Sequence, residues 1–252
     1  MPPKSNLLLG VNIDHVVTLR QARYRTMLAA PNAEPSALAA ALEAEAAGAH
    51  SITVHLRADR RHIQDADVRL LRQKIATRLN LEMGNTPEIL DIALDVRPDF
   101  VCMVPENRQE VTTEGGLDVA GQREALRATV KALSENGTRV SMFIDPDLDQ
   151  VRASADIGAA MIELHTGTFA NTAGAERTAE VDRLCAAAEL GHELGLQINA
   201  GHGLTTQNLP DLWRVPNLAE LNIGHHIVSR AIFIGLRAAV KEMLAVMATY
   251  HD

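Results

Sequence analysis

Short apolar runs alternate along the chain with segments of helical periodicity. An apolar run of about 4–8 residues is typical of a strand buried in a parallel sheet. We expect strands at 7–14, 51–56, 79–83, 100–104, 139–144, 161–165, 196–200 and 220–224. Eight such alternations predict a (β/α)8 TIM barrel, because parallel strands need helical crossovers and eight strands can close.

The rival arrangement is an open, doubly wound parallel sheet. It would be favoured by a glycine-rich dinucleotide-binding fingerprint after the first strand, and none is there. The length of 252 residues suits one α/β barrel, so we expect 1–252 to be a single domain. Long segments after predicted strands 1 and 4, at 15–35 and 105–121, are expected to be loops on the active-site rim.

Five of the ten histidines stand at the ends of apolar runs. They are His15, His55, His165, His202 and His225. The carboxyl ends of parallel strands meet on one rim, so we expect these side chains to converge there. Histidine titrates near neutral pH, which favours acid–base catalysis, although a hydrogen-bonded structural role stays open for each.

Two glutamates fall within predicted strands, where a solvated surface role does not fit. Glu82 lies near the end of RLNLEM and Glu163 lies inside MIELH, each alternating with apolar neighbours. An unpaired buried charge is costly, so we interpret both as functional groups in the barrel mouth. We expect His165 to support Glu163.

Glycine-rich segments follow predicted strands 7 and 8. They are NAGHGL at 199–204 and NIGHH at 222–226. Glycines let backbone N–H groups approach an anion, the helix expected near Ile227 adds its positive end, and barrels commonly bind phosphate at this place. A tight turn without a ligand is the alternative. Arg23, Arg57 and His62 could hold a second anionic group.

Lysine placement argues against one mechanism. The four lysines, Lys4, Lys74, Lys131 and Lys241, lie at the N-terminus or in helical segments. An imine between a barrel lysine and a carbonyl substrate is therefore not expected. If a carbonyl–amine condensation occurs, the amine belongs to the substrate.

Charge, apolar run length and cysteine content indicate which partners and which compartment to expect. A net charge of −8 argues against nucleic acid, which calls for a basic face. The longest apolar runs fall far short of the roughly 18 residues of a membrane span, and the N-terminus does not resemble a signal peptide. Cys102 and Cys185 form no CxxC motif, so we expect a reduced, cytoplasmic protein.

Two other functions stay open on the residues alone. Clustered histidines with Glu82 and Glu163 could bind a catalytic metal in a sugar-phosphate isomerase or hydrolase, although no HxH or HExxH spacing supports this. We therefore expect no metal. A non-catalytic protein that binds a phosphorylated ligand is the third possibility.

Long motifs then carry a family resemblance over nearly the whole chain. GVNIDHVVTLRQAR, ITVHLRADRRHI, LNLEM, VPENRQEVTTEGGLDVAGQ, IELHTG, INAGHGLT and ELNIGHHIVSRAIFIGL resemble, in this order, the pyridoxine 5'-phosphate synthase family. The resemblance implies a TIM barrel in vitamin B6 biosynthesis. It would condense 1-deoxy-D-xylulose 5-phosphate with 3-amino-2-oxopropyl phosphate, giving pyridoxine 5'-phosphate, phosphate and water. It also implies no metal or organic cofactor and a homo-octamer, a tetramer of dimers.

The resemblance assigns roles to residues in these motifs. It implies that His55 and Glu82 accept protons, that His202 donates one, and that Glu163 stabilises a transition state. Substrate-binding positions are implied at Asn12, Asp14, His15, Arg23, Arg57, His62, Thr112, Gly203, Gly224 and His225. Asn12 and Thr112 come from the resemblance alone. The segment 24–35 is longer and more apolar than we expect for the family.

Overall fold

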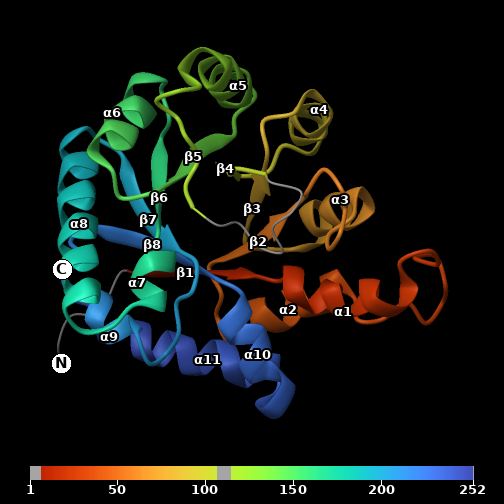
Figure 1. Ribbon diagram of the computed structural model, residues 1–252. Coiled ribbons are helices and arrows are strands. Elements are labelled where there is room, and N and C mark those ends of the chain that lie inside the picture. The colour runs from red at the N-terminus through yellow and green to blue at the C-terminus, as the bar shows by residue number, and fades with distance from the viewer. Residues whose placement is uncertain (1–6, 107–114, 252) are drawn as a thin grey trace.

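Eight parallel strands close into a barrel in the computed structural model, which describes residues 7–106 and 115–251 (Figure 1). Each strand pairs with the next, and the last pairs with the first. The strands are β1 (Leu8–Asn12), β2 (Ser51–His55), β3 (Arg78–Met83), β4 (Phe100–Met103), β5 (Arg139–Ile144), β6 (Met161–His165), β7 (Gln197–Gly201) and β8 (Leu218–Ile223). The predicted (β/α)8 barrel is confirmed, and the open sheet is excluded.

Helices follow the strands and cover the outside of the barrel (Figure 1). They are α1 (Asp14–Tyr24), α2 (Ala37–Ala47), α3 (Asp65–Lys74), α4 (Pro87–Val96), α5 (Arg123–Glu135), α6 (Leu148–Asp156), α7 (Gly167–Asn171), α8 (Gly174–Glu193), α9 (Leu209–Leu212), α10 (His225–Ile234) and α11 (Leu236–Met247). Local sequence sets several starts. The Thr86 hydroxyl, for example, accepts a hydrogen bond from the Ile89 N–H before a proline at the first helical position.

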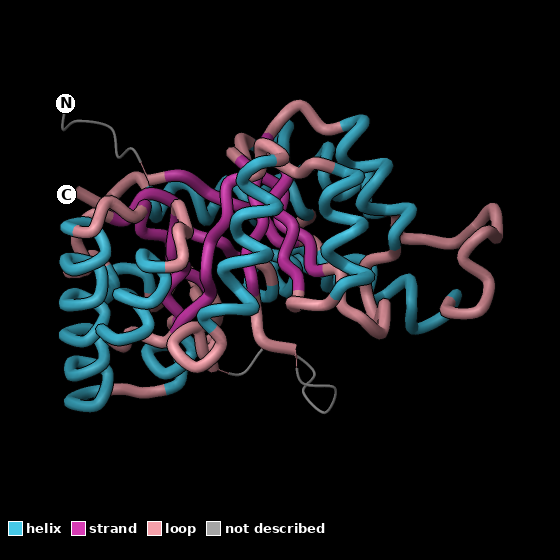
Figure 2. Tube along the Cα trace, turned by 90° about the horizontal axis from the view of Figure 1, so that it is seen from above, coloured by secondary structure: helices cyan, strands magenta, loops and turns pink. Residues whose placement is uncertain are grey.

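The expectation of a rim loop over 15–35 is wrong for its first half, which forms helix α1. The pattern hid this helix because polar residues occupy part of its buried face. Arg20 makes a two-pronged ion pair with Asp67 on α3, at 2.9 and 2.6 Å, and the Gln21 amide donates to the His62 carbonyl. Residues 25–36 then extend away from the barrel (Figure 2).

The two faces of the barrel wall differ in chemistry. Apolar strand residues such as Leu9, Ile52 and Leu81 are fully buried within the main hydrophobic core, under the helices. Hydrogen bonds join buried polar side chains of different strands. The Thr53 hydroxyl donates to Asn222 Oδ1 at 2.9 Å, and the Asn222 amide donates to Glu163 Oε2 at 2.7 Å. These bonds span β2, β8 and β6, so this part of the interior is a hydrogen-bonded polar network rather than an aliphatic core.

This network leaves no room for a side chain at Gly10. A Cβ at Gly10 would overlap Asn222 Oδ1 and lie 2.8 Å from Ser51 Oγ. We predict that Gly10→Ala lowers the free energy of unfolding by about 1–3 kcal/mol, because a packed interior accommodates an added methyl poorly. Urea denaturation followed by circular dichroism measures it, and an unchanged midpoint would contradict the tight packing at this position.

Candidate active site

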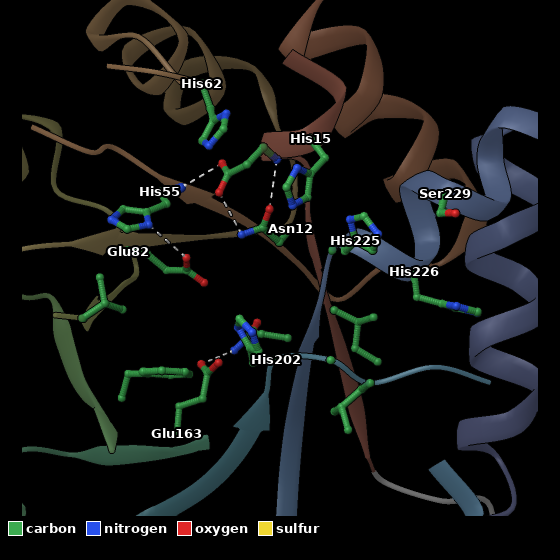
Figure 3. A pocket seen from close by; sticks show the side chains of 18 of the residues that line it. Asn12, His15, His55, His62, Glu82, Glu163, His202, His225, His226 and Ser229 are labelled. Atoms are coloured by element: carbon green, nitrogen blue, oxygen red, sulfur yellow. Dashed lines mark hydrogen bonds and ion pairs between the residues drawn. The ribbon is translucent and has the colours of Figure 1, made fainter. Parts of the chain in front are cut away.

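A cavity of about 450 Å³ opens at the carboxyl ends of the strands (Figure 3). Its volume is in the range of small-molecule binding sites. Of the fourteen residues predicted for the site, twelve line it: Asn12, Asp14, His15, His55, Arg57, His62, Glu82, Glu163, His202, Gly203, Gly224 and His225. Arg23 is not among the lining residues and lies in the last turn of α1. Thr112 lies outside the described residues.

His55 lies at the end of β2 among three carboxylates. Its backbone N–H donates to Asp14 Oδ1 at 2.9 Å, and its ring Nδ1 is 3.8 Å from Glu82 Oε2. On the other side, ring Nε2 is 3.2 Å from Glu106 Oε1. The ring is only 6% exposed, so its orientation is fixed by these contacts. Such a group can pass a proton between neighbouring carboxylates and a ligand in the cavity.

Glu106 was missed at the sequence level. It follows β4, and its carboxylate also accepts hydrogen bonds from the backbone N–H groups of Ala58 and Gly84. Burial raises the pKa of Glu106, but the hydrogen bonds from His55 and Ala58 outweigh it, so the pKa lies below its usual range. Its place directly after an apolar run was the available signal, the same one that selected the strand-end histidines.

Glu82 and Glu163 form the acidic part of the cavity. Burial, and then the charges of Asp14 and Glu163, raise the pKa of Glu82 well above its usual range. Burial also raises the pKa of Glu163 to about 7, against the hydrogen bond from Asn222. Both carboxyls therefore hold protons more tightly than an exposed glutamate, which suits acid–base chemistry near neutral pH.

Histidines form the facing wall (Figure 3). The His15 ring lies 5.1 Å from the His225 ring and 5.9 Å from the His62 ring, between centroids. Burial, and then the charge of His225, lower the pKa of His15. Burial and the neighbouring positive charges lower the pKa of His62 to about 4. His15 and His62 are therefore neutral at pH 7 and can donate N–H hydrogen bonds to an anion.

The segments after β7 and β8 complete this wall. Gly224 precedes α10, whose first residue is His225, so the helix N-terminus faces the cavity. A Cβ at Gly224 would lie 3.0 Å from the Asn12 Cβ, so glycine allows this close approach. His202 follows β7 with a backbone φ of 83°, a conformation that non-glycine residues rarely adopt. Burial, and then the charge of His165, lower the pKa of His202 to about 4.

His165 does not reach the cavity lining. Its ring contacts Asp145, Phe143 and His202. We expected His165 to support Glu163. Its ring packs instead against the His202 ring.

One group of side chains has the spacing of a metal site. Ligand atoms of Asp14, His55 and Glu82 all lie within 4.8 Å of one another. However, Asp14 Oδ1 accepts from the His55 N–H and Oδ2 from the Asn12 amide, at 2.9 and 3.0 Å. These bonds fix the Asp14 carboxylate in place, while each oxygen keeps a further lone pair. The test of a bound cation is therefore the metal dependence of the reaction.

The raised pKa of Glu163 predicts a stability effect with a definite sign. Above about pH 4.5 the unfolded carboxyl ionises while the folded one stays protonated up to about pH 7, so this burial costs more stability as pH rises across that range. We predict that Glu163→Gln stabilises the fold more at about pH 8 than at about pH 5. Urea denaturation at both pH values tests this, with the exposed Glu189→Gln as control. Equal shifts at both would contradict the raised pKa.

Comparisons with known proteins find relatives over nearly the whole chain. The family model described as "Pyridoxal phosphate biosynthesis protein PdxJ" matches residues 9–249. The pyridoxine 5'-phosphate synthase of Akkermansia muciniphila is 60% identical over 94% of this chain and 97% of its own length. That of a Synechococcus species is 56% identical over 96% and 98%.

Solved structures share the fold at low identity. Phosphoribosyl anthranilate isomerase from Thermus thermophilus has a TM-score of 0.61 and 14% identity, covering 97% of this chain and 100% of its own. A 3-hexulose-6-phosphate synthase has a TM-score of 0.61 and 16% identity, covering 95% and 99%. These likenesses support the barrel alone. The family match and the close relatives show that the chain belongs to the PdxJ family of pyridoxal phosphate biosynthesis proteins.

Proposed function

We propose that this protein is a pyridoxine 5'-phosphate synthase. It would condense 1-deoxy-D-xylulose 5-phosphate with 3-amino-2-oxopropyl phosphate and release pyridoxine 5'-phosphate, phosphate and water. The observation that carries the proposal is one cavity with buried carboxyls on one side and neutral imidazoles with a helix N-terminus on the other. The names of the close relatives support the same activity.

The amine of the condensation comes from a substrate in this proposal. No lysine is among the cavity-lining side chains of residues 7–106 and 115–251, which agrees with an attack by the substrate amine on the other substrate's ketone. That amine arrives as an ammonium ion. Its positive charge beside Glu82 would favour the ionised carboxylate, which then accepts a proton and frees the nucleophile.

His55 and Glu82 act together as proton acceptors in this scheme. Ring closure removes protons from carbon, and a base works best with a pKa near the working pH. The raised pKa of Glu82 and its 3.8 Å approach to the His55 ring support this role. Glu163, held by Asn222, would stabilise positive charge that develops in the transition state.

His202 is the proposed proton donor for the departing hydroxyl and phosphate groups. The free protein holds this imidazole neutral, because burial lowers its pKa to about 4. A bound phosphate dianion would raise that pKa again, since an opposite charge favours the protonated form. The donor would thus become charged only when a substrate is present.

Phosphate binding is proposed at two places on the histidine wall. Gly203, Gly224 and His225 would hold one phosphate at the N-terminus of α10. Arg57 and His62 would hold a second anionic group. Asn12, Asp14 and His15 would bind the part of the substrate that lies between the two anionic groups. Arg23 and Thr112 stay predictions from the family resemblance.

The homo-octamer and the cytoplasmic location also belong to this proposal. Ile232 and Phe233 on α10 are 77% and 80% exposed, and Leu19 on α1 is 68% exposed, which favours a self-association surface. Arg23 lies at the end of the same α1 and could reach a cavity of another copy. Cys102 and Cys185 are free, as expected of a reduced compartment. No helix within the described parts of the chain has the length and apolar character of a membrane span.

Incubation with both substrates tests the activity directly. We expect a new pyridine chromophore and one released phosphate per product, and His55→Asn is expected to lower turnover at least about a hundredfold by removing the base. His192→Asn, an exposed histidine on α8, is the matched control. Product formation is followed by absorbance and phosphate by a colorimetric assay. No product from wild-type protein, or full turnover by the His55 variant, would overturn the proposal.

The metal-dependent alternative makes the opposite prediction for chelators. If Asp14, His55 and Glu82 bound a required cation, dialysis against EDTA would abolish turnover and a divalent metal would restore it. We expect undiminished synthesis after such dialysis, because the bases are side chains. Metal content of the protein, measured by plasma emission, gives an independent check. Loss of synthesis and its recovery with one metal would instead show that the reaction requires a bound cation.

A further inference from the structure

We propose that the segment His165-Thr166-Gly167, where β6 ends and α7 begins, acts with Asp145 to position the side chain and backbone of His202. This inference rests on the proposed function, since it concerns the proposed proton donor. None of the four residues lines the cavity, so each would act through His202 and none is a catalytic residue.

The His165 ring provides the side-chain contact. It closes β6 and packs edge-on against the His202 ring, with centroids 5.1 Å apart and planes at 72°. The Phe143 ring packs against His165 at 5.2 Å. His165 is 7% exposed, so these packed rings leave little freedom for the His202 imidazole on that side.

Asp145 fixes the orientation of His165. Its Oδ1 lies 2.8 Å from His165 Nδ1. The hydrogen bond from His165 lowers the pKa of Asp145, and the backbone N–H of Gly116 adds to this. An ionised carboxylate only accepts hydrogen bonds, so Nδ1 must carry the hydrogen of this bond. The ring is thus held in one of its two flips, with Nδ1 toward Asp145.

Thr166 holds the backbone of His202. Its hydroxyl lies 2.6 Å from the carbonyl oxygens of both Gly201 and His202, and shares its one hydrogen between them. Its own N–H donates to the Gly201 carbonyl at 2.9 Å. The side chain is fully buried. These bonds brace the segment in which His202 adopts the unfavourable φ of 83°.

Gly167 leaves the space that the His165 ring needs. A Cβ at this position would overlap His165 Nε2. Position 167 therefore requires glycine, because any side chain would collide with the His165 ring. In this segment His165 contacts the His202 ring and Thr166 holds the His202 backbone. Gly167 leaves room for the His165 ring.

The test uses two substitutions that keep size and shape. Thr166→Val removes the bracing hydroxyl, and Thr166→Ser restores it. Asp145→Asn removes the charge that fixes His165, and Asp149→Asn on α6, 85% exposed, is its matched control. Asp145 is half exposed, so Asp145→Asn is expected to fold even if Thr166→Val disturbs folding. Circular dichroism of each variant verifies the fold.

We expect Thr166→Val and Asp145→Asn to lower kcat about tenfold or more, because a small misplacement of a proton donor is costly. KM for both substrates should stay within about twofold, since ground-state binding is unchanged. Thr166→Ser and Asp149→Asn should retain wild-type kcat. Unchanged kcat in both test variants would overturn the proposal.

A second readout does not depend on activity. Imidazole nitrogen and carbon resonances of His202, assigned by the loss of signal in His202→Gln, should move in Thr166→Val and Asp145→Asn but not in the two controls. Unmoved resonances would overturn the positioning role. If the wild-type protein makes no pyridoxine phosphate, the proposed function fails, and the spectra alone decide the positioning.

Discussion

The alternation of side chains along strands in a closed barrel is the constraint on which the rest of this structure depends. Successive residues point to opposite faces, so every second strand residue enters one narrow interior. Here much of that interior is polar, and several of its buried polar groups are joined by hydrogen bonds from strand to strand. Thr53, Asn222 and Glu163 form such a chain. One residue of register shift would turn these groups toward the helices and break both hydrogen bonds.

The polar interior explains how Glu163 is buried with no ion pair to another residue of 7–106 or 115–251. Asn222 donates to its carboxyl, and burial raises its pKa to about 7, so a proton can supply what a cation would otherwise provide. The neighbouring Glu82 follows the same rule nearer the mouth, where Asn12 provides the hydrogen bond. Burial of these carboxyls, together with the charges of Asp14 and Glu163 beside Glu82, thus keeps exchangeable protons in the cavity.

The strands could be predicted from the sequence because each is a short apolar run, and Glu82, Glu163 and His55 could be found because they interrupt or end such runs. Helix α1 was missed because Arg20 and Gln21 occupy its buried side, where their polar groups are paired rather than absent. Glu106 and the partners of His165 depend on which strand ends lie side by side. The closure of the barrel decides which strand ends are neighbours. The periodicity of a single segment does not reveal this.

The two walls of the cavity differ in how they respond to a ligand. The imidazoles of His15, His62 and His202 have lowered pKa values, so the cavity does not gather a large positive charge. The carboxyls have raised pKa values, so it does not gather a large negative charge either. A substrate that carries both an ammonium and a phosphate would reverse both shifts at once. Its ammonium would ionise a carboxyl and its phosphate would protonate an imidazole, so the acid and the base would be formed together by the molecule on which they act.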